Sequence, residues 1–344
     1  QALPWIIARD ERLTHQPTRT QPVQVLVVIV NFKTADLVAA CLKSLAEEHL
    51  QTPQLRVVVV DNPGDDDSAT QLDATVSANG WREWVEVLPM PRNGGFAYGV
   101  NAGVQTGLTA AAPPDAFLLL NPDTYIHPGA IAALVDFLAT NPSTGIAGSR
   151  LEDADGTVQH SRFRFPSIAS TLDEALKLGI VSRLLRHRVT CPPLTDAPHE
   201  TDWLAGASML IRREVFEQVG PFDEGYFLYF EELDFSRRAR DLGISSWYVP
   251  QSRVVHLVGQ STGVTVRDRR PNRIPAYWFE SRSRYYRKHH TRLYKIATDL
   301  TFVVGRIGYQ LLRVVRGRAD HEPPRFLLDF IRHNFWFRRS GSRS

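Results

Sequence analysis

The chain is poor in cysteine, with only Cys41 and Cys191 among 344 residues. Two cysteines are too few for a disulfide scaffold, and they form no CxxC pair or cysteine–histidine cluster, so a reducing compartment is expected. A signal peptide is not expected either, because charged residues occupy positions 9–12, where its apolar core would lie.

The usual glycine-rich nucleotide motifs are also missing. No GxGxxG follows the first predicted strand and no GxxxxGK(S/T) occurs, which argues against a Rossmann dehydrogenase and a P-loop enzyme. A sugar nucleotidyltransferase would need a glycine-rich loop directly after that strand, where this chain has Asn31–Lys33. A glycine-rich stretch does occur later, over 92–103, and a helix is predicted to begin within it. Backbone there can approach a ligand closely, and a helix N-terminus favours phosphate.

Charge is distributed unevenly along the chain. Apolar residues make up 43% and charged residues 22%, so a sizeable core is expected, and the net charge is only +3. Residues 266–344, however, contain 19 basic and 6 acidic residues, which gives a net charge of +13. The remaining 265 residues contain 21 basic and 31 acidic residues, which gives a net charge of −10. A basic tail on an acidic body predicts a polyanionic partner, either anionic lipid or nucleic acid.

Apolar patterning predicts an α/β fold. Residues 23–30, 55–60 and 118–120 are valine- or leucine-rich runs typical of strands buried on both faces. An amphipathic helix over 36–48 joins the first two in a right-handed βαβ unit. Further strands are predicted over 84–88, 145–149, 208–211 and 244–249, and further helices over 65–80, 129–140, 168–178, 215–219 and 231–241. Residues 150–200 are otherwise predicted to be a long irregular insertion that shapes an acceptor site.

The strand over 118–120 ends at a polar corner. Pro122 lacks an N–H for the ladder and restricts Asn121 before it, so the strand stops there. Asp123 is then expected at the carboxyl edge of a central strand, where open α/β sheets bind ligands. A carboxylate fixed there suits a hard cation, Mg²⁺ or Mn²⁺, which in turn suits a diphosphate. An ordinary Asn-Pro-Asp turn is the alternative.

Three acidic residues, Glu231, Glu232 and Asp234, open the helix predicted over 231–241. The helix dipole favours carboxylates in a first turn, which is a purely structural explanation. They also follow an aromatic-rich loop over 222–230, and a carboxylate among aromatic rings is desolvated, which raises its pKa toward that of a general base. His256, beyond the next strand, is either structural or part of the same edge as Asp123.

Together these segments resemble the family 2 glycosyltransferases, and more narrowly their bacterial rhamnosyltransferase-like branch. The similarity spans residues 23–263 and rests on motifs in the family's order: VVIVNFK at 27–33, VDN at 60–62, and the segments 92–103, 118–123, 203–213, 219–234 and 256–262. The resemblance implies a GT-A fold, with a mixed, mainly parallel sheet flanked by helices. It also implies inverting, metal-dependent transfer from a nucleotide-diphospho-sugar, which we expect to be dTDP- or UDP-linked.

The resemblance further implies roles for individual residues. The family's D-x-D motif falls on Asn121–Asp123, so Asp123 is the expected metal ligand although Asn121 replaces the first aspartate, and His256 is the expected partner on the metal or phosphate side. The catalytic acid pair falls on Glu231 and Glu232, with Glu232 as general base and Asp234 as second choice. Donor contacts are expected from Asn31, Asp61, Arg92, Asn93, Asn101 and Asn121.

Three regions are predicted: an N-terminal extension over 1–21, the glycosyltransferase domain over 22–265, and a basic helical region over 266–344. The last has a helical apolar stripe with charged and polar residues opposite; the stripe is Leu300, Val303, Val304, Ile307, Leu311, Val314 and Val315, and the opposite residues are Asp299, Arg306, Gln310 and Arg313. These charges are too closely spaced for a transmembrane span, whereas a basic amphipathic helix suits the headgroup layer. Packing on the body or on a second subunit is the alternative. Nucleic acid is not expected, because no nucleic-acid-binding fold accompanies the charge.

The predicted function is transfer of a sugar, with rhamnose the candidate, to a hydroxyl of a glycan or lipid-linked acceptor. The process would be cell-envelope polysaccharide synthesis at the cytoplasmic face of the inner membrane. Two alternatives stay open: a catalytically inactive nucleotide-sugar-binding module, because Asn121 departs from D-x-D, and a sugar nucleotidyltransferase.

Overall fold

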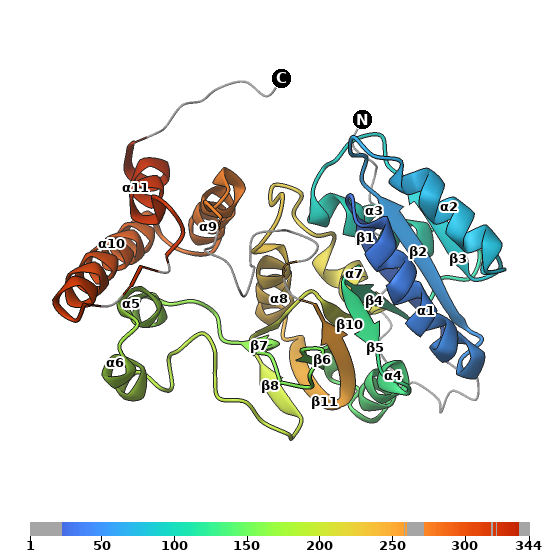
Figure 1. Ribbon diagram of the computed structural model, residues 1–344. Helices are drawn as coiled ribbons and strands as arrows, with labels where there is room; N and C mark the ends of the chain where they lie inside the picture. The colour runs from blue at the N-terminus through green and yellow to red at the C-terminus, as the bar shows by residue number, and fades with distance from the viewer. Residues whose placement is uncertain (1–22, 258, 260–271, 318, 321, 337–344) are drawn as a thin grey trace.

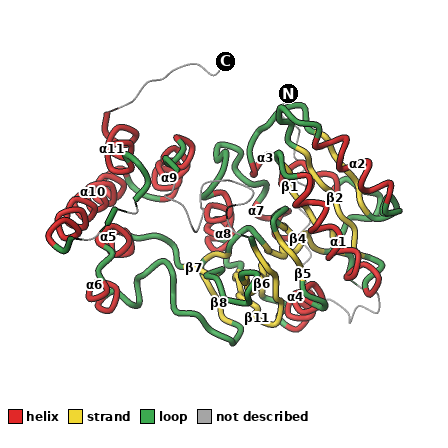
Figure 2. The backbone as a smooth tube through the Cα atoms, in the orientation of Figure 1, coloured by secondary structure: helices red, strands yellow, loops and turns green. Residues whose placement is uncertain are grey.

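The computed structural model describes residues 23–257, 259, 272–317, 319–320 and 322–336. The predicted N-terminal extension and the predicted boundary at residue 265 lie outside these residues. Figures 1 and 2 show a twisted sheet with helices on both faces and, to one side, a second group formed by the C-terminal helices with α5 (Ile168–Leu176) and α6 (Gly179–Leu184).

In the described residues, nine strands form one mixed sheet in the order β3–β2–β1–β4–β10–β6–β11–β5, with β8 paired to β11. β3, β2, β1 and β4 run parallel, as do β6 and β11, while β10 is antiparallel to both of its neighbours and joins the two parts. The predicted α/β class is therefore confirmed. The strand bounds are β1 Val25–Asn31, β2 Leu55–Asp61, β3 Val85–Pro89, β4 Ala116–Leu120, β5 Thr124–Ile126, β6 Thr144–Glu152, β8 His199–Thr201, β10 Ser208–Arg212 and β11 Ser245–His256.

Two hydrophobic layers enclose the sheet, as the valine-rich strands require. On one face Val27 and Ile29 of β1 pack with α1 (Ala35–Gln51), and the same layer includes α2 (Ser68–Ala78) and α4 (Ala130–Thr140). The alternate residues Val28 and Val30 face the other layer, which contains α3 (Phe96–Leu108), α7 (Arg213–Val219) and α8 (Glu231–Asp241). Successive side chains of a strand point to opposite faces, so both faces of β1 must be apolar.

The predictions missed the shortest elements and one long helix. Residues 150–200, which the structure describes in full, are more regular than expected: they include β7 (Arg162–Phe163), α5, α6 and part of β8. β7 pairs with β9 (Trp203–Leu204) in a separate two-stranded sheet. Strands of two or three residues are too short to show a periodicity, so the sequence pattern could not reveal them. The missed long helix is α9 (Ala276–His289).

The C-terminal region folds into α9, α10 (Arg292–Val315), α11 (Phe326–Ile331) and a π-helical turn over Arg332–Trp336. α10 packs along α5, and two of the charged residues predicted opposite its apolar stripe, Asp299 and Arg306, are buried. Asp299 pairs with Arg282 at 2.5 Å, and Arg306 pairs with Glu322. Packing on the body is thus confirmed for the polar face of α10. Within the described part of the chain, no helix is both long and apolar enough to cross a membrane.

Candidate active site

The parallel strands β1 and β2 end side by side at Asn31 and Asp61. Both residues are buried, and Asn31 Nδ2 donates a hydrogen bond of 2.6 Å to Asp61 Oδ1. Asn31 Oδ1 accepts from the backbone N–H and the hydroxyl of Thr34 at the start of α1. Burial raises the pKa of Asp61, and the hydrogen bond from Asn31 partly opposes this. Two of the expected donor residues therefore form one ordered polar pair at the carboxyl edge of the sheet.

A cavity of about 260 Å³ opens beside this pair. Asn93 and Asn121, both expected at the donor site, lie on its wall. Asn62 lines it too: its Nδ2 donates to the carbonyl of Gly95 at 3.1 Å, while its buried Oδ1 has no hydrogen-bond partner among the described residues. A buried acceptor without a partner calls for an explanation, and a ligand donor is one. The lining residues are Val30, Phe32, Thr34, Asn62, Asn93, Gly95, Phe96, Asn121, Pro122, Phe227, Leu228 and Tyr277.

Arg92 and Asn101 lie elsewhere. The Arg92 guanidinium is exposed and stacks 4.3 Å from the centre of the Tyr98 ring. Asn101 is buried, and its amide donates to the carbonyl of Phe222 and accepts from the N–H of the same residue. Neither residue lines the cavity. Asn101 instead anchors the start of the aromatic-rich loop to α3.

Asp123 and His256 come together although 133 positions separate them in the sequence. His256 ends β11 opposite Thr124 of β5, and the N–H of Leu257 donates to the carbonyl of Asp123 at 2.9 Å. His256 Nε2 lies 3.5 Å from Asp123 Oδ1, and Asp123 is only 1% exposed. His256 Nδ1 lies 3.3 Å from Gln159 Oε1, so a proton on Nδ1 would leave Nε2 as the acceptor toward Asn121 Nδ2 at 3.5 Å.

Asp123 and His256 fit a divalent cation whose remaining coordination positions are filled by a bound ligand. Among the described residues, no group of three or more His, Cys, Asp or Glu side chains could hold a metal by itself. Mg²⁺ and the chemically similar Mn²⁺ commonly take only one or two protein side chains and fill the remaining positions with phosphate oxygens and water. A buried carboxylate and an imidazole whose other nitrogen is held by Gln159 match that pattern.

Glu231 and Glu232 begin α8 after two strained residues. Tyr229 and Phe230 have φ of 68° and 71°, a left-handed conformation that is uncommon outside glycine. Burial raises the pKa of Glu231 well above its ordinary value, and the neighbouring charge of Glu232 adds to this. Burial likewise raises the pKa of Glu232 to about 7. Each carboxylate has a buried Oε2 without a hydrogen-bond partner among the described residues, which suggests a function rather than a structural role.

Asp234 has a different environment from these two glutamates. Its carboxylate is fully buried and contacts Arg238 Nε at 2.9 Å, His289 Nε2 at 2.7 Å and the ammonium of Lys288 at 2.8 Å. Burial raises the pKa of Asp234, but the hydrogen bonds from His289 and Lys288, together with the nearby cations, hold it below its usual range. A carboxylate so stabilised in its ionised form is a poor proton acceptor.

A two-residue stretch before β10 connects the two halves of the site. The carbonyl of Ala207 accepts from the N–H of Asn121 at 3.1 Å, and Gly206 lies beside the side chain of Glu232. A methyl group added at Gly206 would lie 3.9 Å from Glu232 Cβ and 3.7 Å from Phe96 Cε1, on the cavity wall. The segments bearing Asp123 and Glu232 therefore meet at Gly206–Ala207, at the carboxyl edge of β4.

Helix α9 holds the loop that leads into α8, and Figure 1 shows α8 between the sheet and the C-terminal helices. Arg284 and Lys288 both pair with Asp223 at the start of the loop. Ser281 Oγ donates to the carbonyl of Leu228 at 3.0 Å, and Tyr277 lies on the cavity wall. The basic C-terminal region thus forms part of the site. The charge pattern of this region did not predict that contribution.

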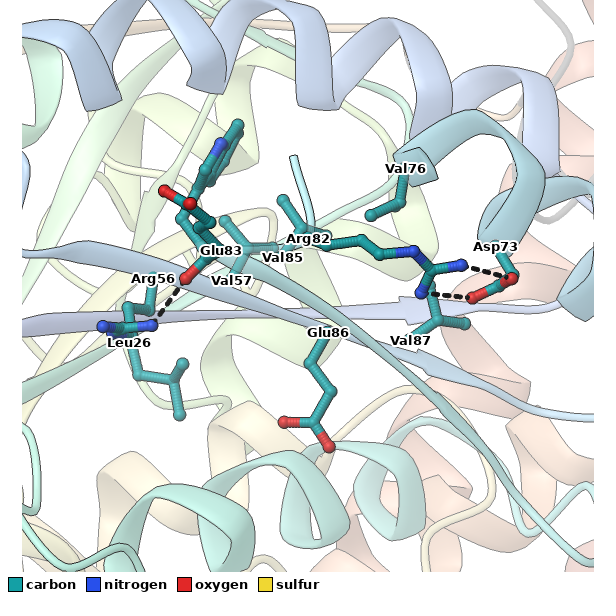
Figure 3. Close-up of a pocket in the computed structure, with 11 residues that line it drawn as sticks. Leu26, Arg56, Val57, Asp73, Val76, Arg82, Glu83, Val85, Glu86 and Val87 are labelled. Atoms are coloured by element: carbon teal, nitrogen blue, oxygen red, sulfur yellow. Dashed lines mark hydrogen bonds and ion pairs between the residues drawn. The ribbon is translucent and has the colours of Figure 1, made fainter. Parts of the chain in front are cut away.

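A larger hollow of about 420 Å³ lies beside β3, away from these residues (Figure 3). Its wall includes the early residues of β1 and β2, such as Leu26 and Arg56, so it faces the opposite edge of the sheet. Arg82 there makes two hydrogen bonds to the carboxylate of Asp73. It contains none of the expected site residues.

Sequence prediction missed Asn62, Gln159, Phe96, Phe227 and Tyr277. A signal for Asn62 existed, because it follows a buried strand at the edge where ligands bind. The other four lie in different segments: Gln159 in the insertion, Phe96 at the start of α3, Phe227 in the aromatic-rich loop and Tyr277 in α9. Only the folded chain brings those segments together.

The sheet, the polar carboxyl edge and the cavity define a nucleotide-sugar-transferase type of fold. A model of the family described as "Glycosyltransferase like family 2" matches residues 22–273, so the chain belongs to this family. The chain is 35% identical over 199 residues to N-acetylglucosaminyl-diphospho-decaprenol L-rhamnosyltransferase of Mycobacterium tuberculosis, covering 52% of this chain and 61% of that protein. It is 32% identical over 114 residues to rhamnosyltransferase WbbL of Escherichia coli, covering 29% and 43% of the two chains. The resemblance to bacterial rhamnosyltransferases is thereby confirmed.

Among solved structures, a mannosyltransferase from Pyrobaculum calidifontis, in complex with GDP-Man and Mn²⁺, superposes with a TM-score of 0.54 at 14% identity. The superposition covers 88% of this chain and 77% of that one. At this identity the likeness concerns the fold, and it supports the GT-A architecture.

Proposed function

We propose that the protein is an inverting, metal-dependent glycosyltransferase. It would move a sugar, with rhamnose the candidate, from a dTDP- or UDP-linked donor to a hydroxyl of a glycan or lipid-linked acceptor in cell-envelope polysaccharide synthesis. The observation that carries the proposal is the pair formed by buried Glu231 and half-buried Glu232, each with a buried carboxylate oxygen that has no hydrogen-bond partner among the described residues. Glu232 lies beside Gly206, and the carbonyl of the next residue, Ala207, accepts from the N–H of Asn121 in the segment that bears Asp123. The names of the rhamnosyltransferase relatives support the sugar, and the diphospho-decaprenol in one of them supports a lipid-linked acceptor.

In this proposal the cavity receives the donor nucleotide. Asn31 and Asp61 are preordered by their mutual hydrogen bond, and Asn62 Oδ1 offers an acceptor for a base or ribose donor. The aromatic rings of Phe96 and Phe227 on the wall would shield an apolar ring face from water. Asn93 and Asn121 add amide groups toward the diphosphate side.

Glu232 is the proposed general base. Burial and the charge of Glu232 both raise the pKa of Glu231 well above its ordinary value, whereas the pKa of Glu232 is raised to about 7, so Glu232 is the member of the pair proposed to accept the proton. A carboxylate with a pKa near the working pH can accept the proton of an incoming hydroxyl as that oxygen attacks the anomeric carbon. Asp234 is not proposed for this role, because three basic side chains hold it ionised.

Asp123 and His256 would hold the cation. A bound Mg²⁺ or Mn²⁺ neutralises charge that develops on the leaving diphosphate. The burial of Asp123 keeps its carboxylate fixed, and the contact of Gln159 with His256 fixes the imidazole, so both ligands are preorganised.

The test is release of nucleotide diphosphate from a panel of dTDP-, UDP- and GDP-sugars, with Mn²⁺ or with a chelator. We expect slow hydrolysis of one donor, stimulated by Mn²⁺ and accelerated by a soluble diphospho-lipid acceptor analogue. Donor binding without turnover, seen as a thermal shift alone, would instead indicate an inactive binding module. Formation of a nucleoside triphosphate from donor and pyrophosphate would indicate a nucleotidyltransferase.

The raised pKa of Glu232 predicts the pH profile. Only the ionised carboxylate accepts a proton, so kcat should rise with pH and level off above an apparent pKa of about 7. The folded state holds this proton more tightly than the unfolded state, so the contribution of Glu232 to the free energy of unfolding should fall as pH rises from about 4.5 to about 7. Profiles of kcat and of thermal unfolding, measured on wild type and on Glu232→Gln, test both. An acid limb that persists in the variant would assign it to another group.

A further inference from the structure

Helix α10 presents a row of apolar side chains to the outside. Leu293, Leu300, Ile307 and Val314 follow one another at seven-residue intervals, which is about two helical turns, so they lie on one line along a helix roughly 36 Å long. The row, called here the α10 stripe, has side chains 38–83% exposed: Leu293, Ile296, Leu300, Val304, Ile307, Leu311, Val314 and Val315. An apolar row of this length on the surface marks an interaction site.

The opposite face of α10 fixes the stripe in this outward orientation. Asp299 and Arg306 are buried and paired with Arg282 and Glu322. Phe302, on the same face, stacks on Phe330 of α11 with ring centres 4.1 Å apart. Turning the stripe inward would leave these charges without their partners, so a partner must come to the stripe.

Basic residues stand at both ends of the stripe, and the exposed carboxylate of Asp320 is paired with Arg313 of α10 at 3.0 Å. Arg292 and Arg316, at the two ends of α10, are exposed and form no ion pair within the described part of the chain. The same holds for Arg287, Arg325 and Arg332 on the neighbouring segments. The single carboxylate of α10, Asp299, is buried. The surface therefore combines an apolar row with positive charge at both of its ends.

We propose that the α10 stripe is a membrane-docking surface that lies in the headgroup layer of an anionic bilayer. The apolar row would enter the boundary of the acyl chains, and Arg292 and Arg316 would reach lipid phosphates. This docking proposal deepens the proposed function. It rests on that function in one respect only, namely that docking would bring the enzyme to a lipid-linked acceptor. A second copy of the chain fits less well: an antiparallel pair of α10 helices would bring Arg292 against the partner's Arg316, and a parallel pair would bring each arginine against its own counterpart.

Docking there would also orient the active site. Only His290 and Thr291 separate α9 from α10. α9 supplies Tyr277 to the cavity wall and holds the loop before Glu231 through Arg284 and Lys288. A bilayer bound at α10 would therefore position the catalytic cleft at a set distance from the membrane, where the head of a lipid-linked acceptor is presented.

The test is flotation of the full chain with vesicles of equal parts phosphatidylglycerol and phosphatidylethanolamine, and with pure phosphatidylcholine vesicles. We expect wild type to bind the anionic vesicles, less so at high salt, and the triple variant Leu300→Glu, Ile307→Glu and Leu311→Glu to lose roughly 10²-fold in partitioning. Arg292→Glu with Arg316→Glu should lose about tenfold or more on anionic vesicles alone. The matched control is Leu50→Glu, since Leu50 is 82% exposed on α1, far in sequence from the stripe, and it should bind as wild type does.

Circular dichroism and donor hydrolysis in detergent-free buffer serve as controls for folding and should be equal in all variants. Donor hydrolysis also separates this proposal from the proposed function, because it needs no membrane. The docking proposal is overturned if wild type ignores anionic vesicles or if the triple variant still floats with them. It is equally overturned if wild type is a dimer in vesicle-free buffer that the triple variant converts to monomer, since a second copy would then occupy the stripe.

Discussion

Replacing Glu232 with glutamine is expected to lower kcat by roughly 10²–10⁴-fold while the donor binds as before. The substitution keeps the size of the side chain and removes its ability to accept a proton. Because glutamine matches glutamate in shape and its amide oxygen can still accept hydrogen bonds, the local structure should persist. The measurement is nucleotide diphosphate release at saturating donor, with donor affinity from calorimetry.

Two further variants make this result specific. Glu217→Gln alters an exposed glutamate of α7, whose side chain is 55% exposed, and should leave kcat unchanged. Asp234→Asn should lower thermal stability, because Arg238, Lys288 and His289 lose the charge they share, with a smaller effect on kcat per folded molecule. Near-normal turnover by Glu232→Gln, or a kcat loss in Asp234→Asn as large as that expected for Glu232→Gln, would remove Glu232 from the role of base.

Replacing Asp123 with alanine is expected to abolish the response to divalent cations and to lower activity by roughly 10²–10³-fold, because charge on the leaving diphosphate is no longer neutralised. Activity across a titration of Mn²⁺ and chelator measures the first effect. Electron paramagnetic resonance of Mn²⁺ in the presence of nucleotide diphosphate gives a readout independent of turnover, and the bound signal should disappear.

The control for this variant is Asp136→Asn, on an exposed position of α4, which should behave as wild type in both measurements. His256→Ala should weaken Mn²⁺ binding without eliminating it, since Asp123 remains. Wild-type activity that is unchanged by a chelator, or an unaltered Mn²⁺ signal in Asp123→Ala, would contradict the metal assignment.

The C-terminal region contributes both to the donor cavity and to the proposed membrane-docking surface. Through Tyr277, Ser281 and Arg284 it shapes the cavity and restrains the loop before Glu231. Through α10 it offers the surface proposed to meet the bilayer. The family model ends at residue 273, so α9, which lies against the catalytic segment, is outside the matched part. Substitutions in α9 should therefore be read for effects on catalysis as well as on stability.

Strand and helix patterning carried most of the fold. The valine- and leucine-rich runs at β1, β2 and β4 are, as predicted, strands buried on both faces, and α8 occupies the predicted residues 231–241. Local patterning also predicted that the strand ends at Pro122, just before Asp123, and that Glu231 and Glu232 begin a helix. These inferences succeed because backbone geometry and side-chain alternation are properties of a few neighbouring residues.

The amino-acid sequence by itself determined the α/β class, the family motifs and the residue types needed for a base and a cation site. Only the tertiary structure decided which carboxylates share an environment. Glu231 and Glu232 each have a buried oxygen without a hydrogen-bond partner among the described residues, whereas Asp234, two residues beyond Glu232, is surrounded by cations from α8 and α9. It likewise decided that α10 buries its charged face and exposes its apolar one. Burial and charge pairing depend on segments far apart in the chain, and no local pattern encodes them.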